Sequence, residues 1–168
     1  MSMGMGGEAF VDPATARRES WPTLRQFCIF MENRVGRLHE LLRHIEQHDL
    51  RVIALSIVDS VDCAIARVMV DKTDRGREIF RMAGFQFSES DLIGVALPDD
   101  PQPYVKICMA MLQAEVNILY TYPLLYRAHG RGAIALYVDD VDLGLRVLRE
   151  KDHEIITESD IESDDGYL

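Results

Sequence analysis

The chain has 168 residues, of which 48% are hydrophobic, and a formal net charge of −10 at pH 7. This length supports one average domain or two small domains that share a core. The negative charge argues against nucleic acid and anionic membranes as partners, because their phosphate groups would be repelled by the field of the whole molecule.

The compartment can be inferred from apolar runs and cysteines. No apolar run reaches the roughly 18 to 20 residues of a membrane span, and the first residues lack the charged start and apolar stretch of a signal peptide. Three widely spaced cysteines, Cys28, Cys63 and Cys108, favour free thiols in a reducing compartment, and Cys28 and Cys108 lie in apolar patterns typical of buried thiols. We therefore expect a cytoplasmic protein.

Both ends of the chain lack the spacing of a packed element. Residues 1–22 contain glycines and two prolines but no repeated apolar spacing, which predicts a disordered N-terminal arm. Residues 162–168 carry acidic side chains and no basic ones, which predicts a solvated acidic tail.

Residues 23–90 predict a first folded unit. An apolar, β-prone strand at 24–31 is followed by Asn33, a helix cap, and Gly36, a tight turn, so a helix begins near Arg37. Strands at 52–58 and 64–70, a helix at 74–83 that ends at Gly84, and a strand at 85–87 complete the unit. The helix stripe that faces the sheet has the spacing i, i+3, i+4 and i+7 and consists of Leu38, Leu41, Leu42 and Ile45.

Residues 91–161 predict a second unit with the same order. Its strands are expected at 92–97, 118–124, 133–138 and 154–157, and its helices at 103–114 and 141–151. The sequence Ser-Glu-Ser-Asp-Leu at 88–92 returns as Thr-Glu-Ser-Asp-Ile at 157–161, which indicates a duplication. Val52 aligns with Ile118 at an offset of 66 residues and Ala66 with Ala135 at 69, which predicts a three-residue insertion. The predicted fold is α+β, with two ferredoxin-like βαββαβ repeats whose antiparallel sheets are packed by helices.

One helix of the second repeat is apolar on both faces. Val105, Met109 and Leu112 replace the polar residues found 66 positions earlier in the first repeat. Exposing them would forgo roughly 1.5 to 3 kcal/mol each, so we expect this face to be covered by another subunit, the other repeat, the N-terminal arm or neighbouring residues of the helix.

The arrangement resembles the ACT domain, a small-molecule regulatory module of amino-acid metabolism. The strand at 27–31 runs into Glu32-Asn33-Arg34-Val35-Gly36, and Gly36 opens the helix, as in that family. The two repeats over residues 24–161 are similar to tandem ACT proteins, including those that resemble the small regulatory subunit of acetolactate synthase. A strand-turn-glycine-helix junction also occurs in other ferredoxin-like folds for steric reasons.

The resemblance implies a ligand site where the first loop and helix start of one unit face the second strand of the other. The free N–H groups near the helix start could receive a carboxylate, and Asn33 could hold an amino group. Asn33 and Gly36 could equally be a helix cap and a turn. The residues that this reading places at the site are Asn33, Arg34, Val35, Gly36, Arg37, Leu38, Tyr120 and Tyr122.

The facing strand and the second loop each have a structural explanation besides ligand binding. Tyr120 and Tyr122 share a strand face and could line an apolar pocket, but core or subunit packing explains them equally well. The equivalent second loop, residues 98–103, has Gln102 at the glycine position and Asp99 and Asp100 beside the helix start. We expect these carboxylates to cap the helix rather than bind a ligand.

An enzyme is the least favoured class. His44 and His48 have metal-ligand spacing but no third ligand nearby, Cys108 lies in an apolar helix, and His129 lies in a basic, glycine-rich hairpin without a nucleophile beside it. We predict no catalytic residue, no metal and no cofactor. The leading hypothesis is a dimeric regulatory protein that binds an amino acid and modulates a metabolic enzyme, and the alternative is a protein interaction module without a ligand.

Overall fold

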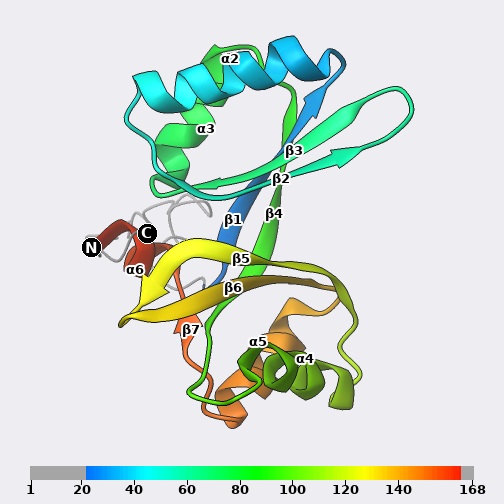
Figure 1. Cartoon of the computed structure of the whole chain (residues 1–168), viewed down its shortest axis with the longest axis vertical. Helices are drawn as coiled ribbons and strands as arrows, with labels where there is room; N and C mark the ends of the chain where they lie inside the picture. Colours follow the sequence, from blue (N-terminus) through cyan, green and yellow to red (C-terminus); the bar gives the residue numbers. More distant parts are fainter. Residues whose placement is uncertain (1–21, 164–168) are drawn as a thin grey trace, which may run out of the picture.

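The computed structural model describes residues 22–163. The predicted arm before residue 22 and the tail after residue 163 lie outside this range. Within it the predicted α+β class with two βαββαβ repeats is confirmed (Figure 1). Repeat 1 contains β1 (Leu24–Met31), α2 (Arg34–Gln47), β2 (Val52–Asp59), β3 (Ala64–Val70), α3 (Thr73–Met82) and the first half of β4 (Phe87–Ala96).

Repeat 2 starts within β4 and repeats the order. It contains the second half of β4, α4 (Pro103–Gln113), β5 (Ile118–Ala128), β6 (Arg131–Val138), α5 (Val141–Glu150) and β7 (Ile155–Ile156). A short helix, α6 (Glu158–Ser163), follows β7. The sequence did not predict α6, whose residues were assigned partly to the end of repeat 2 and partly to an acidic tail.

Strand β4 belongs to both repeats. Its first half pairs with β1, from Phe87 opposite Ile29 to Leu92 opposite Leu24, and its second half pairs with β6 and β7. The prediction of separate strands at 85–87 and 92–97 was therefore wrong. The polar residues between them stay extended because β1 pairs with them, and Arg25 Nε lies 2.9 Å from Asp91 Oδ1. The predicted domain boundary at residue 90 falls inside this strand.

The molecule is layered, with helices outside and two sheet halves inside (Figure 1). The strand order is β2-β3-β1-β4-β6-β5, and the two end strands, β2 and β5, come together without pairing. Helices α2 and α3 pack on the outer face of the repeat 1 strands, and α4 and α5 pack on that of repeat 2. We call the two opposite sheet faces, which face one another, the inner faces.

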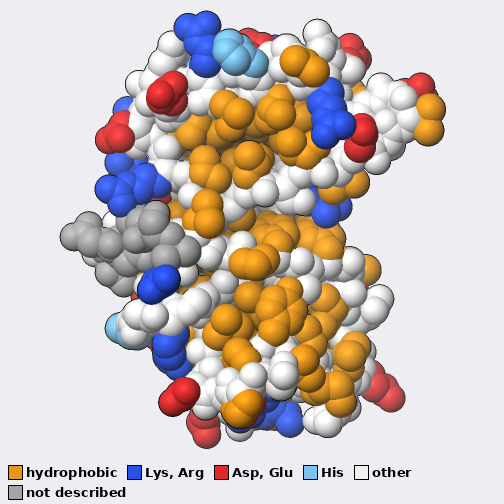
Figure 2. All heavy atoms as spheres, viewed as in Figure 1, with side chains coloured by type: hydrophobic (Ala, Val, Ile, Leu, Met, Phe, Trp, Pro, Cys, Tyr) orange, Lys and Arg blue, Asp and Glu red, His pale blue; other side chains and the backbone are white. Residues whose placement is uncertain are grey.

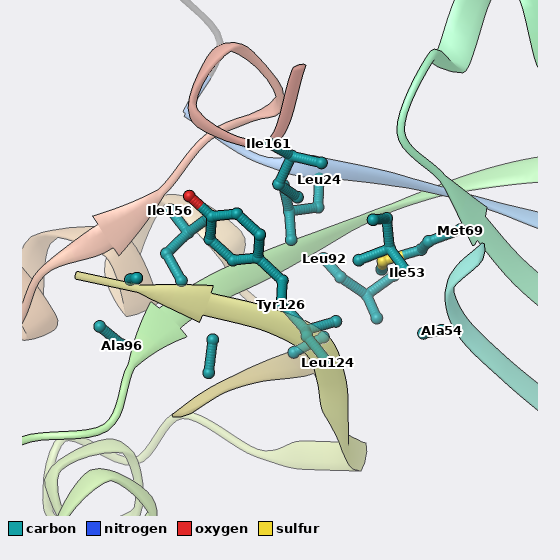
Figure 3. Close-up of a cluster of buried hydrophobic side chains, with 13 residues drawn as sticks. Leu24, Ile53, Ala54, Met69, Leu92, Ala96, Leu124, Tyr126, Ile156 and Ile161 are labelled. Carbon is teal, nitrogen blue, oxygen red and sulfur yellow. The ribbon is translucent and has the colours of Figure 1, made fainter. Parts of the chain in front are cut away.

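Each helix layer closes its own core. In repeat 1, Phe27 is fully buried and meets the rings of Phe80 and Phe87 edge to face, at centroid distances of 5.2 and 5.5 Å. Burying one such ring contributes about 1.5 to 3 kcal/mol. A third cluster joins the inner faces and includes Ile53, Met69, Leu92 and Leu124 (Figure 3). The repeats therefore share a core and are not two independent domains.

Strand register corrects the predicted alignment of the repeats. Phe27 pairs with Val68, and Ile93, 66 residues after Phe27, pairs with Leu136. Val68 and Leu136 are 68 residues apart, so the insertion is two residues, not three. The alignment of Ala66 with Ala135 was wrong by one position, which in a strand exchanges the faces. Ala66 lies in the helix-side core, whereas Ala135 lies between the inner faces.

The repeated pentapeptide adopts two different structures. Residues 88–92 are part of β4, whereas residues 157–161 turn into α6. Thr157 and Asp160 cap this turn reciprocally, since the Thr157 N–H donates to Asp160 Oδ2 and the Asp160 N–H donates to Thr157 Oγ1. In the first copy the chain continues as a strand because β1 supplies a pairing edge.

The apolar outer face of α4 is exposed. Val105, Met109 and Leu112 are each about half accessible, so no other part of residues 22–163 covers them fully. Hydrophobic side chains also occupy much of the face seen in Figure 2, over both repeats. Among these residues, no helix is both long and apolar enough to cross a bilayer.

Candidate ligand-binding site

The predicted loop after β1 is exposed. Asn33 Oδ1 accepts a hydrogen bond from the Gly36 N–H at 3.3 Å, so the side chain of Asn33 caps α2. The helix begins at Arg34, three residues earlier than predicted, because this cap lies at residue 33. Within residues 22–163 the N–H groups of Arg34 and Val35 have no hydrogen-bond partner, so the first turn can accept an anion.

The other predicted loop residues divide between surface and core. A Cβ on Gly36 would lie 3.0 Å from Asn33 Nδ2, so the glycine keeps the cap uncrowded. Arg37 forms an ion pair with Glu40 at 2.7 Å and lies 4.5 Å from the ring centroid of Phe85. Leu38 packs against the helix-side core of repeat 1, which gives it a structural role.

Tyr120 and Tyr122 contact a different part of repeat 1. The side-chain amide of Gln26 donates to Tyr120 Oη at 2.8 Å, and the Tyr122 hydroxyl donates to Gln26 Oε1. The tyrosine rings stack with centroids 6.1 Å apart, and Tyr137 lies 4.8 Å from Tyr120. This network joins the two repeats across their inner faces.

Gln26 has no accessible surface, and its amide is satisfied by this network. An unsatisfied buried amide would cost about 1 to 3 kcal/mol, so the tyrosines and Gln26 depend on one another. Burial raises the pKa of the Tyr122 hydroxyl well above its usual value, and the neighbouring Tyr120 and Cys28 raise it further. Burial likewise raises the pKa of Tyr120, so both hydroxyls stay neutral at physiological pH.

Arg67 and Cys28 complete this cluster. The guanidinium carbon of Arg67 lies 3.8 Å from the centroid of the Tyr120 ring. Arg67 is opposite Cys28 in the sheet, and Cys28 Sγ accepts from the Gln26 amide at 3.3 Å and lies 3.8 Å from Ser90 Oγ. Cys28 is partly exposed, and not fully buried as its apolar neighbours suggested.

The predicted site residues therefore form two groups. The loop reaches the end of β2 through an ion pair between Arg34 and Asp59 at 2.9 Å, and Tyr120 reaches β2 through Arg67, which is opposite Ser56. Ser56 and Asp59 are three positions apart in β2, or roughly 10 Å, and side-chain alternation places them on opposite faces of the strand. The two groups therefore do not contact the same small molecule at one point.

The second loop is occupied by its own charges. Asp100 accepts from the Gln102 N–H at 2.9 Å and pairs with Lys106 at 3.3 Å. The Gln102 hydrogen bond, followed by Lys106, holds the pKa of Asp100 below its usual value. The Asp100 carboxylate thus takes the place beside the start of α4 that the carboxylate of a ligand would otherwise occupy.

The remaining candidates do not form a reactive centre. His44 and His48 stack with centroids 6.1 Å apart, and no group of three potential metal ligands occurs among residues 22–163. Glu154 lies 3.2 Å from His129 and forms an ion pair with Arg131, which offsets part of the positive charge of the hairpin. Burial raises the pKa of Cys108, so its thiol is a weak nucleophile.

A small pocket lies beside α6, but its polar groups are engaged. It is lined in part by Arg25, Asp71, Thr73 and Glu158. Glu158 Oε1 accepts from the Arg25 N–H and from the Thr73 hydroxyl, each at 2.9 Å, and Asp71 accepts from the Arg51 N–H. These bonds dock α6 on repeat 1 and leave little to orient a ligand.

The sequence reading missed Gln26 and Arg67. Gln26 is the one polar residue on the inner face of β1, and the strand's other polar residue, Arg25, lies on the opposite face, so this pattern could have marked Gln26 as a buried amide. Arg67 occupies a similar place in β3, between buried alanine and valine, and looks like an ordinary surface charge in the sequence.

The chain resembles a known protein family and several solved structures. A family model described as ACT domain pair matches residues 22–163. Protein BT0572 from Bacteroides thetaiotaomicron has a similar structure, with a TM-score of 0.75 and 24% identity over 83% of this chain and 96% of that one. The ligand-free regulatory subunit of aspartate kinase from Thermus thermophilus has a TM-score of 0.50 and 12% identity, over 76% and 91% of the two chains. At these identities the likeness shows the fold alone. A comparison with curated protein sequences found no match.

Proposed function

Because this chain belongs to the ACT domain pair family, we propose that it is a non-catalytic regulatory protein that binds an amino acid between its units and modulates a metabolic enzyme. The observation that carries the proposal is the network of Gln26, Tyr120 and Tyr122, which joins the repeats beside a partly open surface. A ligand that contacts both repeats there favours one arrangement of them over others. The regulated enzyme would respond to that shift in population.

The proposal also includes the exposed loop that begins at Asn33, which the ion pair between Arg34 and Asp59 links to the end of β2. The loop contributes free N–H groups at the start of α2, next to Gly36, whose lack of a side chain keeps the approach open.

A thermal-shift screen against the twenty amino acids tests this function. A ligand at one hundred times its dissociation constant adds about 2.7 kcal/mol, or roughly 5 to 10 °C for a chain of this size. We expect a saturable shift with one chemical class of amino acid. A flat response, repeated by calorimetry, would contradict the proposal.

The loop is tested with Gly36→Val, which places a branched side chain against the Asn33 cap. We expect a folded protein with at least about tenfold weaker binding, the loss expected from one charge-assisted hydrogen bond. His39→Val, on the exposed side of the same helix, is the matched control. Equal affinities of both variants and the wild type would remove the loop from the site.

A second candidate function is a protein interaction module, which the exposed α4 face favours. Val105, Met109 and Leu112 form an apolar stripe that a second copy of the chain could cover. We expect Met109→Asp to lower the mass in solution from dimer to monomer. An unchanged mass would exclude this face as the dimer interface.

A further inference from the structure

Arg67 differs from the other half-buried arginines in the described part of the chain. Arg25, Arg37 and Arg77 are also half-buried, and each forms an ion pair with a carboxylate at 2.9 Å or less. For Arg67 no carboxylate of residues 22–163 lies within 4.0 Å, and its contact is the ring of Tyr120 at 3.8 Å. In a protein of net charge −10, it is unusual that a half-buried guanidinium finds no counter-ion among the described residues.

The stacking leaves the hydrogen-bonding edge of Arg67 available. A guanidinium that lies over an aromatic ring uses its face, so its N–H groups can still point to a carboxylate in their own plane. No hydrogen bond from this side chain to any acceptor in residues 22–163 occupies them. Tyr120 Oη accepts from Gln26 at 2.8 Å, so its hydroxyl hydrogen is free to donate, and it too has no acceptor in that range.

An apolar row lies next to Arg67 on the same inner face. Ile65 pairs with Val58 on one side and with Phe30 on the other, just as Arg67 pairs with Ser56 and Cys28. Because side chains alternate along a strand, residues two apart share a face, so the two rows are adjacent. Phe30 and Val58 are 39% and 38% exposed, although they face away from α2 and α3.

The spacing of the rows suits a small amphipathic acid. Two residues along a strand correspond to about 7 Å, which matches the reach of an aliphatic or aromatic amino acid from its carboxylate to its side chain. Arg67 and Tyr120 supply the guanidinium and hydroxyl donors. Phe30, Ile65 and Val58 supply apolar surface that loses water on binding.

We propose that Arg67 is the anion-binding residue of the ligand site and holds the carboxylate of a small apolar amino acid, whose side chain lies over Phe30, Ile65 and Val58. This inference rests on the proposed function and changes one part of it, because it moves the carboxylate from the start of α2 to the inner face of β3. A guanidinium with no carboxylate partner in residues 22–163, beside an apolar row, calls for an occupant with both a carboxylate and an apolar group, which a small apolar amino acid supplies.

The test is a residue-resolved NMR titration of the full chain with L-leucine and L-phenylalanine, and with their amides, which lack the carboxylate. We expect saturable shifts at Phe30, Ile65 and Arg67. The wild type should bind each acid about 10 to 100 times more tightly than its amide, which is the factor for a charge-assisted pair. Arg67→Met keeps the stem on Tyr120 and should remove this preference, whereas Arg67→Lys should retain part of it.

Arg146→Met, an exposed arginine on α5, is the matched control and should bind as the wild type does. Shifts confined to residues 33–38 that survive Arg67→Met would overturn this inference and leave the proposed function intact. Saturable binding of polar or charged amino acids only would overturn it as well. The absence of saturable shifts with any of the twenty amino acids would overturn both proposals. A dimer in which a second copy covers Phe30 and Val58 without ligand would also refute it.

Discussion

The inner faces of the two repeats are formed by equivalent strands but differ in how far their side chains are buried. Val58 and Phe30 of repeat 1 are 38% and 39% exposed, whereas their equivalents in repeat 2, Leu124 and Ala96, are 3% and 2% exposed. Arg67 is likewise half-buried, while its equivalent Ala135 is fully buried. At these positions the inner face of repeat 2 is core, whereas that of repeat 1 is partly exposed.

Elements that only repeat 2 has close its inner face. Strands β5 and β6 are longer than β2 and β3, and the buried Tyr126 of β5 belongs to the shared cluster (Figure 3). Helix α6 adds Ile161 to the same cluster and is held by Glu158. In repeat 1 the corresponding residues continue as β4, so no equivalent of α6 within residues 22–163 covers the face. The repeated pentapeptide therefore continues as a strand in repeat 1 and leads into a helix that covers the inner face in repeat 2.

The largest effect is expected from equivalent truncations in the two repeats. Leu124→Ala removes a buried side chain and should lower the free energy of unfolding by about 2 to 5 kcal/mol. Val58→Ala removes a half-exposed side chain and should cost about 1 kcal/mol or less. Urea unfolding of both variants measures the difference. Similar losses would mean that the two faces are closed to the same extent.

An intermediate effect is expected from making repeat 1 resemble repeat 2. Gln26→Leu installs the residue of the equivalent position, Leu92, and leaves the hydroxyls of Tyr120 and Tyr122 without their partner. The cost should be about 1 to 3 kcal/mol in urea unfolding. Adding Tyr122→Phe to this variant should cost less than Tyr122→Phe costs in the wild type. Strictly additive losses would show that the network is not coupled.

The smallest effect is a dependence on alkaline pH. The pKa of Tyr122 is raised in the folded protein, mainly by burial, whereas in the unfolded chain the hydroxyl ionises near pH 10. Above that pH the unfolded state releases a proton that the folded state keeps, so stability falls as pH rises, by at most about 1.4 kcal/mol per unit. Tyr122→Phe should show a shallower decline between about pH 9 and about pH 11. Identical slopes would contradict a buried, neutral Tyr122.

Periodicity was sufficient for the fold class and for most elements, but not for β4, α6 or the site. Alternating and helical apolar spacing identified the strands and helices of both repeats, because each one buries a continuous face. The single strand β4 could not be predicted, since the polar residues 88–91 remain extended only because β1 pairs with them. The loop from Asn33 was identified by its local cap and turn. Arg67 was not, because its significance depends on Tyr120, which is 53 residues away in sequence and comes from the other repeat.

Hydrogen exchange with and without a saturating amino acid tests the central claim most directly, because it compares equivalent strands in one experiment. The account predicts that the ligand slows exchange in residues 28–30, 56–58 and 65–67 of repeat 1 and leaves the equivalent strand residues of repeat 2 unchanged. Slower exchange in repeat 2 alone, or no change with any amino acid, would contradict the assignment of the ligand site to the open inner face.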